Sequence, residues 1–95
     1  MDIDSLIKKI ESTFIELGFK KEFIGEMQYQ YLVHNNCYCK ITYLEKLGAF
    51  VIESADNLND AINGALEDGD LYYADISENA MLCQLRKDIV AYYMD

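Results

Sequence analysis

The chain contains no proline, no tryptophan and one histidine, and its 8 basic residues are outnumbered by 17 acidic ones. No apolar run approaches the roughly 20 residues that a helix needs to cross a bilayer. The first residues, Met1-Asp2-Ile3-Asp4, include acids where a secretory signal begins with basic residues. These absences predict a cytoplasmic protein that does not bind membranes.

Cysteine is scarce, and the 3 cysteines are an odd number. Cys37 and Cys39 are expected on one face of a strand, at a spacing that disfavours a bridge between them. Cys83 lies far away along the chain. We therefore expect reduced thiols and no disulfide framework.

Basic residues are missing altogether from one stretch of the chain. Of the net charge of −9, the segment 53–78 carries −8, because it contains eight acids and neither lysine nor arginine. These acids are Glu53, Asp56, Asp60, Glu67, Asp68, Asp70, Asp75 and Glu78. Such a concentration of negative charge repels nucleic acid and favours rapid encounter with a basic protein surface.

Two segments have the apolar spacing of amphipathic helices. The first is expected from about Asp4 to Leu17, with Asp2 or Asp4 as its cap and Gly18 at its end. The second closes the chain and begins after Ser77, which can cap it. Both helices should lie with one face on a sheet.

Strands are expected where the apolar period changes to two. From Met27 to His34 apolar and polar residues alternate, Asn35-Asn36 interrupts, and the segment 37–43 continues the pattern, which predicts a β-hairpin. The segment Ala49 to Glu53 predicts a third strand, and the short connections favour antiparallel pairing.

The acidic stretch itself predicts mixed structure. Asp56 or Asn57 can cap a short helix that reaches about Leu66, and Glu67-Asp68-Gly69-Asp70 is typical of a turn. The segment 71–76 predicts a short edge strand. The expected fold is therefore one α+β domain, residues 1–95, with a three- to four-stranded antiparallel sheet, helices on one face and the order α-β-β-β-α-(β)-α.

Several residues invite a chemical role. His34 and Cys37 are neighbours, but nothing in the sequence would lower the pKa of the thiol. With Cys39 and Cys83 they could ligate a metal, yet the paired spacing of structural zinc sites is missing. Strand alternation instead directs Cys37 and Cys39 into the core.

A calcium-binding loop is another chemical role that the acidic residues suggest. Asp56, Asp60 and Glu67 fit positions 1, 5 and 12 of such a loop, but Leu58 and Ala61 occupy positions that need an oxygen ligand and a glycine. A phosphate-binding glycine loop is missing too. We therefore expect no enzymatic activity, no bound metal and no cofactor.

Tyrosine is abundant, with 8 residues. Tyrosine is enriched at protein interfaces, and it also serves as an ordinary strand and core-rim residue. In the consecutive pair Tyr72-Tyr73, a strand directs one ring outward. The predicted partner-binding surface combines this pair with the neighbouring acids: Glu53, Asp56, Asp60, Glu67, Asp68, Asp70, Tyr72, Tyr73 and Asp75.

The N-terminal helix, the tyrosine-containing hairpin, the segments 50–61 and 67–72 and the closing helix together resemble small bacterial immunity proteins of polymorphic toxin systems. The resemblance covers most of the chain. It implies a cytosolic protein that binds and neutralises a cognate toxin, often by covering a basic active site. The alternative is a structural or adaptor protein that self-associates, for example as a homodimer, through a sheet edge or an apolar face.

Overall fold

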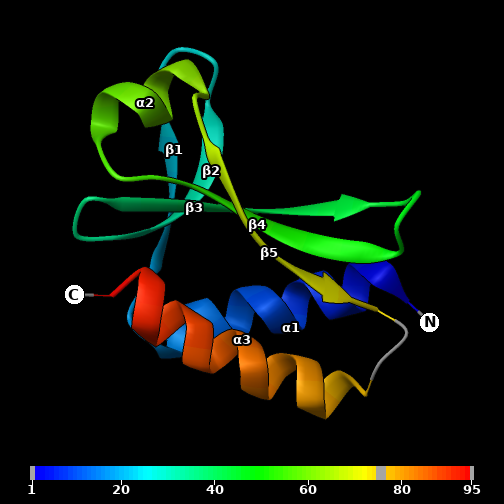
Figure 1. The fold of residues 1–95 in the computed structure, drawn as a ribbon. Coiled ribbons are helices and arrows are strands. Elements are labelled where there is room, and N and C mark those ends of the chain that lie inside the picture. Colours follow the sequence, from blue (N-terminus) through cyan, green and yellow to red (C-terminus); the bar gives the residue numbers. More distant parts are fainter. Residues whose placement is uncertain (1, 75–76, 95) are drawn as a thin grey trace.

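A computed structural model describes residues 2–74 and 77–94 and shows a five-stranded antiparallel sheet with helices packed on it (Figure 1). The strands lie side by side in chain order, β1-β2-β3-β4-β5. The elements are α1 (Ile3–Glu16), β1 (Lys20–Ile24), β2 (Tyr29–His34), β3 (Cys37–Leu44), β4 (Ala49–Ala55), α2 (Leu58–Asn63), β5 (Glu67–Tyr73) and α3 (Glu78–Tyr92). The predicted α+β class is confirmed, with five strands in place of three or four.

Local signals set the ends of α1 as the sequence indicates. The Asp2 carboxylate accepts hydrogen bonds from the backbone N–H of Asp4 and Ser5, at 3.1 and 3.3 Å. Gly18 follows the helix with a φ of 105°, a conformation that L side chains rarely adopt. The predicted hairpin is also confirmed: β2 and β3 pair up to His34 and Cys37 around the two-residue turn.

The first strand, β1, was not predicted. It pairs antiparallel with β2, from Lys20 opposite Val33 to Ile24 opposite Tyr29. Most of its residues are exposed, since it is an edge strand with charged residues on both faces, and therefore the sequence has no alternating pattern there. Met27 lies in the turn between the two strands, so β2 begins later than expected.

The prediction of a turn at residues 67–70 is wrong, because these residues form the first half of β5. Glu67 pairs with Ser54 and Asp68 with Glu53, and a register shift separates these pairs from the pairing of residues 71–73. Helix α2 is shorter than expected, because Gly64 ends it with a φ of 69°. The predicted edge strand reaches residues 75–76, which lie outside the described residues.

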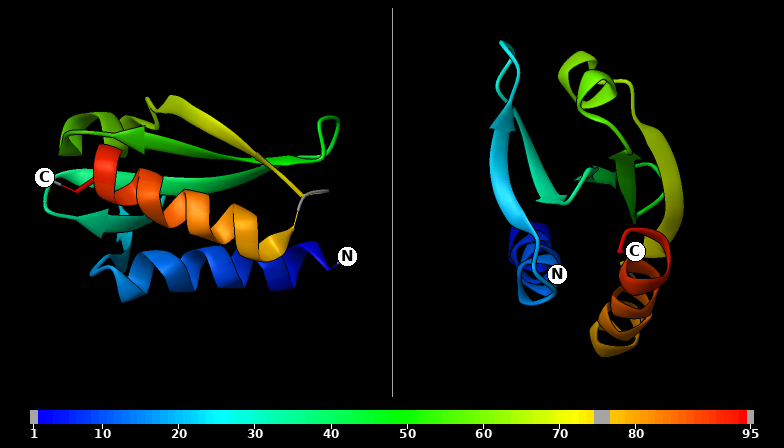
Figure 2. Two further views of the ribbon diagram at one scale, coloured as in Figure 1. Left: turned by 60° about the horizontal axis from the view of Figure 1, so that its bottom comes forward. Right: turned by 90° about the vertical axis from the view of Figure 1, so that its left-hand side faces the viewer.

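The bent sheet buries apolar side chains on both of its faces. Helices α1 and α3 lie together against one face, and α2 packs on the other, where the Tyr31 hydroxyl donates to the Ala61 carbonyl at 2.7 Å (Figure 2). The expectation of helices on one face therefore holds for α1 and α3 only. The larger core comprises Leu6, Ile10, Phe14, Phe19, Leu32, Cys39, Phe50, Ile52, Tyr72, Ala74, Met81, Leu85 and Ile89.

Candidate protein-binding surface

The acids of the central stretch come from three neighbouring elements. Glu53 is on β4, Asp56 follows it, Asp60 is on α2, and Glu67, Asp68 and Asp70 are on β5. We call these six residues the acidic surface. Asp75, the ninth residue of the predicted site, lies outside the described residues.

Three of these carboxylates gather around one hollow. Asp56, Asp60 and Glu67 line a depression of about 390 Å³ between the end of β4, α2 and the start of β5. The Asn57 side chain organises two of them, because its amide N–H groups donate to Asp56 and Asp60 at 3.0 Å each. Its oxygen accepts from the backbone N–H of Asp60 at 2.8 Å, which caps α2. The cap of the helix therefore also positions the acids.

Two further carboxylates lie opposite each other on the neighbouring strands β4 and β5. Glu53 and Asp68 are directly paired in the register of β4 and β5, an arrangement of like charges that destabilises a strand pair. Glu53 accepts a hydrogen bond from the Thr42 hydroxyl. Lys40 is opposite Glu53 on β3, but its ammonium group lies 6.0 Å from the centre of the Tyr29 ring and forms no ion pair with Glu53.

The negative charge of the acidic surface is not compensated within the described part of the chain. The three ion pairs found there join Lys9 to Glu78, Lys21 to Glu11 and Arg86 to Glu16. None of the six carboxylates of the acidic surface takes part in them. Three of the eight basic side chains are thus paired with other acids, and no ion pair within the described residues neutralises a carboxylate of the acidic surface.

The two tyrosines of the predicted site have opposite orientations. Tyr73 is 44% exposed, whereas Tyr72 is 7% exposed and belongs to the core. Burial and the hydrogen bond to Asp88 raise the pKa of Tyr72 above its ordinary value. Tyr72 is therefore not a surface contact, because its side of β5 faces α3.

A second acidic feature, missed in the sequence, lies between β5 and α3. Asp88 is 8% exposed, and its carboxylate accepts from the Tyr72 hydroxyl at 2.6 Å and from the Gln84 amide at 2.9 Å. A groove of about 320 Å³ connects it with Asp70. Helical spacing from Met81 and Leu85 places residue 88 on the buried side of α3, and that spacing is the signal that could have identified it.

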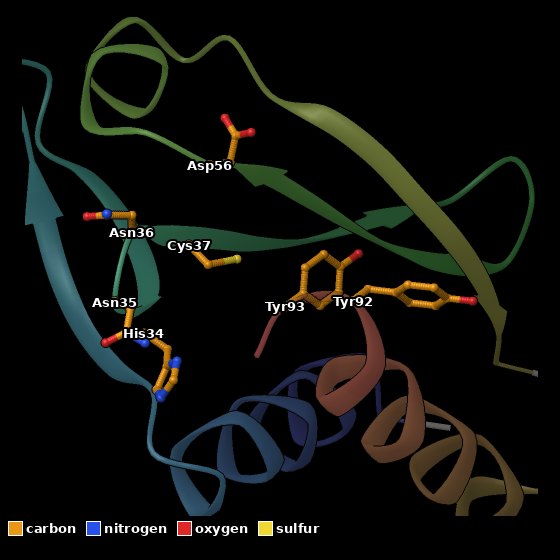
Figure 3. Close-up of a pocket in the computed structure, with 7 residues that line it drawn as sticks. All are labelled: His34, Asn35, Asn36, Cys37, Asp56, Tyr92 and Tyr93. Carbon is orange, nitrogen blue, oxygen red and sulfur yellow. The ribbon is translucent and has the colours of Figure 1, made fainter. Parts of the chain in front are cut away.

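The pair of His34 and Cys37 shows no convergent geometry. Both line a hollow of about 270 Å³ at the end of the hairpin, together with Asn35, Asn36, Asp56, Tyr92 and Tyr93. In Figure 3 the Cys37 thiol points toward Tyr93, whereas the imidazole lies on the other side of Cys37 and the Asp56 carboxylate points away from the tyrosine rings. The imidazole stacks near Phe19, with ring centres 5.2 Å apart.

Cys37 and Cys39 face the core, as strand alternation predicts, whereas Cys83 on α3 is exposed. The Cys37 and Cys39 sulfurs are 3.6 Å apart on the side of β3 that faces the helices. This hydrogen bond and burial raise the pKa of the Cys39 thiol above its ordinary value. Within residues 2–74 and 77–94, no three His, Cys, Asp or Glu side chains are grouped to hold a metal ion.

No helix in the described ranges combines the length and the apolar character needed to span a bilayer. Comparison with protein-family models, with curated proteins and with solved structures gave no match for this chain.

Proposed function

We propose that this protein is a non-enzymatic binding module of the immunity type, which neutralises a basic bacterial toxin domain through its acidic surface. One observation supports the proposal above all. Six carboxylates come from the segment 53–70 of β4, α2 and β5, with Asp70 on the side of α3, and no lysine or arginine of the described chain forms an ion pair with any of them. An opposing pair such as Glu53 and Asp68 costs stability in the free protein, and a cationic partner relieves that cost.

The mechanism is electrostatic attraction followed by steric blocking. Uncompensated charge accelerates encounter with a basic surface by roughly tenfold to a thousandfold, and salt weakens the effect. Once bound, the acidic surface covers the cationic residues that a toxin uses to hold an anionic substrate. Tyr73, the exposed ring beside the acids, supplies apolar contact area at the margin of this surface.

The test begins with identification of the partner. The tagged protein is incubated with a lysate of its source organism at low and at high salt, and the bound proteins are identified by mass spectrometry. The gene of a recovered basic protein is then expressed in a bacterium with and without this protein. The recovered protein should slow growth when it is expressed alone, and co-expression of this protein should restore normal growth.

Charge variants decide whether the acidic surface is responsible. Neutralising Asp60 and Asp68 together, as Asp60→Asn and Asp68→Asn, should slow association with the purified partner by about tenfold and reduce its salt dependence. The control neutralises Glu26 and Glu45, two exposed acids in turns outside the acidic surface, and changes the net charge equally. Equal association rates for the two variants would remove the acidic surface from the mechanism.

A further inference from the structure

Strand β5 leaves one side of its backbone unpaired. Within the described residues, it is the last strand of the sheet and pairs with β4 alone. Just beyond it, the Ala74 N–H donates to the Gly48 carbonyl at 2.9 Å. In an antiparallel pair, residues that bond to the neighbouring strand alternate with residues whose N–H and C=O point away from it. Counting back from Ala74, the backbone groups of Leu71 and Tyr73 therefore point to the open edge.

A groove runs beside this edge. It has a volume of about 320 Å³ and lies between residues 70–73 of β5 and Met81, Gln84 and Asp88 of α3. The edge strand and α3 can be followed side by side in Figure 1. A strand added at the edge would therefore enter an existing depression and displace no element of the described fold.

The two faces of β5 beside this groove carry different kinds of side chain. Asp70 precedes Tyr72 by two residues, so both lie on the face of β5 that is turned toward α3 and Asp88. The opposite face carries Leu71 and Tyr73, which are 38% and 44% exposed. An incoming strand thus meets carboxylates on one face and exposed apolar side chains on the other.

Asp88 strengthens the negative character of the groove. Its hydrogen-bond donors, Tyr72 and Gln84, are both neutral, and no ion pair to it occurs within the described ranges. A carboxylate that is 8% exposed is poorly screened by water, so its charge acts strongly on a group placed in the groove.

We infer that this groove receives an extended basic segment of the partner, which adds to β5 as a sixth strand. The segment pairs its backbone with Leu71 and Tyr73. Its lysines or arginines face Asp70 and Asp88, and the alternate apolar side chains pack on the exposed rings and methyl groups of the opposite face. The inference rests on the proposed function for the basic character of the partner.

The same charges disfavour a second β5 strand as the occupant. Pairing β5 with its own copy would bring Glu67, Asp68 and Asp70 of two chains together, and charged edge residues are a known obstacle to such pairing. A basic strand removes this repulsion, so the acids both block self-pairing and select the partner.

The test uses the 95-residue chain and synthetic peptides, and needs no toxin. Isotope-labelled protein is titrated with a blocked hexapeptide of alternating lysine and valine, and backbone amide shifts are followed by NMR. A peptide of the same composition with three lysines followed by three valines is the first control. The second control is the alternating peptide with N-methyl groups on the amides that would face the edge of β5.

The alternating peptide should shift amides at residues 70–74 and bind about tenfold more tightly than the N-methylated one, which cannot form the same backbone hydrogen bonds. Asp70→Asn and Asp88→Asn should each weaken binding, whereas Glu45→Gln, with the same change of net charge, should not. Thermal unfolding of each variant shows that the fold is retained.

Two results would overturn the inference. Equal binding of all three peptides would mean that charge alone holds them and that no strand is added. Shifts that miss β5, or that appear at β5 with rising protein concentration before any peptide is added, would exclude a basic peptide as the occupant. Neither result bears on the toxin experiment, which measures neutralisation and association whatever the backbone geometry.

Discussion

The hydroxyl of Tyr72 donates a hydrogen bond to the carboxylate of Asp88 at 2.6 Å, and this contact joins the edge strand β5 to α3. Both residues are more than nine-tenths buried. Because Gln84 supplies a second donor, the carboxylate is satisfied although no cation among the described residues pairs with it. The contact positions the wall of the groove beside β5, so stability and the inferred binding site depend on the same two side chains.

Replacing Tyr72 with phenylalanine should destabilise the protein by about 1.5–3 kcal/mol, because the buried Asp88 carboxylate loses one of its two donors. Urea unfolding followed by circular dichroism measures the change. Tyr73→Phe is the matched control, since the Tyr73 ring is exposed and its hydroxyl makes no hydrogen bond in the described structure; its effect should stay below about 0.5 kcal/mol. Equal effects of the two substitutions would contradict the assigned role of the contact.

The sequence predicted those elements whose signals are local. The cap at Asp2, the apolar spacing of α1 and the turn at Asn35-Asn36 act within a few residues, and the structure has them where expected. Strand β1 has no such signal, because pairing with β2 defines it. Residues 67–70 carry turn-forming residues, yet pairing with β4 holds them extended.

The candidate surface was predictable in composition but not in geometry. The absence of basic residues between Glu53 and Glu78 indicated where charge concentrates. Which tyrosine of the pair faces outward depends on the register of β5 against β4, and that register includes a shift. Asp88 is far from the other acids in the sequence and reaches the groove only because α3 packs under β5.

Asn57→Ala should open α2 more often, because the substitution removes the cap of the helix and the donor that holds Asp56 and Asp60. Loss of an N-cap costs about 0.5–2 kcal/mol. Hydrogen exchange of the amides at residues 58–63 should accelerate accordingly, while exchange in the central strands stays slow. Asn59→Ala, at an exposed position of the same helix, is the control and should leave protection unchanged or slightly higher.

Asp68→Asn should stabilise the free protein by about 0.2–1 kcal/mol, because it removes the like-charge pair with Glu53 and leaves the hydrogen bond from Thr42 to Glu53 in place. The gain should shrink as salt is added, since ions screen the repulsion. Unfolding free energies at two ionic strengths, with Glu45→Gln as the control for net charge, provide the measurement. A loss of stability on neutralising Asp68 would show that its charge is compensated within the fold.

Ionisation of Tyr93 should lower the stability of the folded protein at high pH. Burial, with smaller contributions from Cys39, Cys37, Asp70 and Asp88, raises the pKa of Tyr93 to about 12 from 10.0. The folded protein therefore holds this proton more tightly than the unfolded chain does. The resulting stabilisation is complete below pH 10 and is lost as the pH rises toward 12.

Tyr93→Phe should accordingly show a shallower decline in unfolding free energy between pH 10 and 12 than the wild type does, because phenylalanine has no proton to lose. Urea titrations at several pH values across this interval provide the comparison. Tyr92→Phe removes a hydroxyl from the neighbouring ring, which is 66% exposed, and should keep the wild-type decline. If both variants followed the wild type, the alkaline loss would have to come from other groups, foremost Tyr72, whose pKa burial and Asp88 also raise.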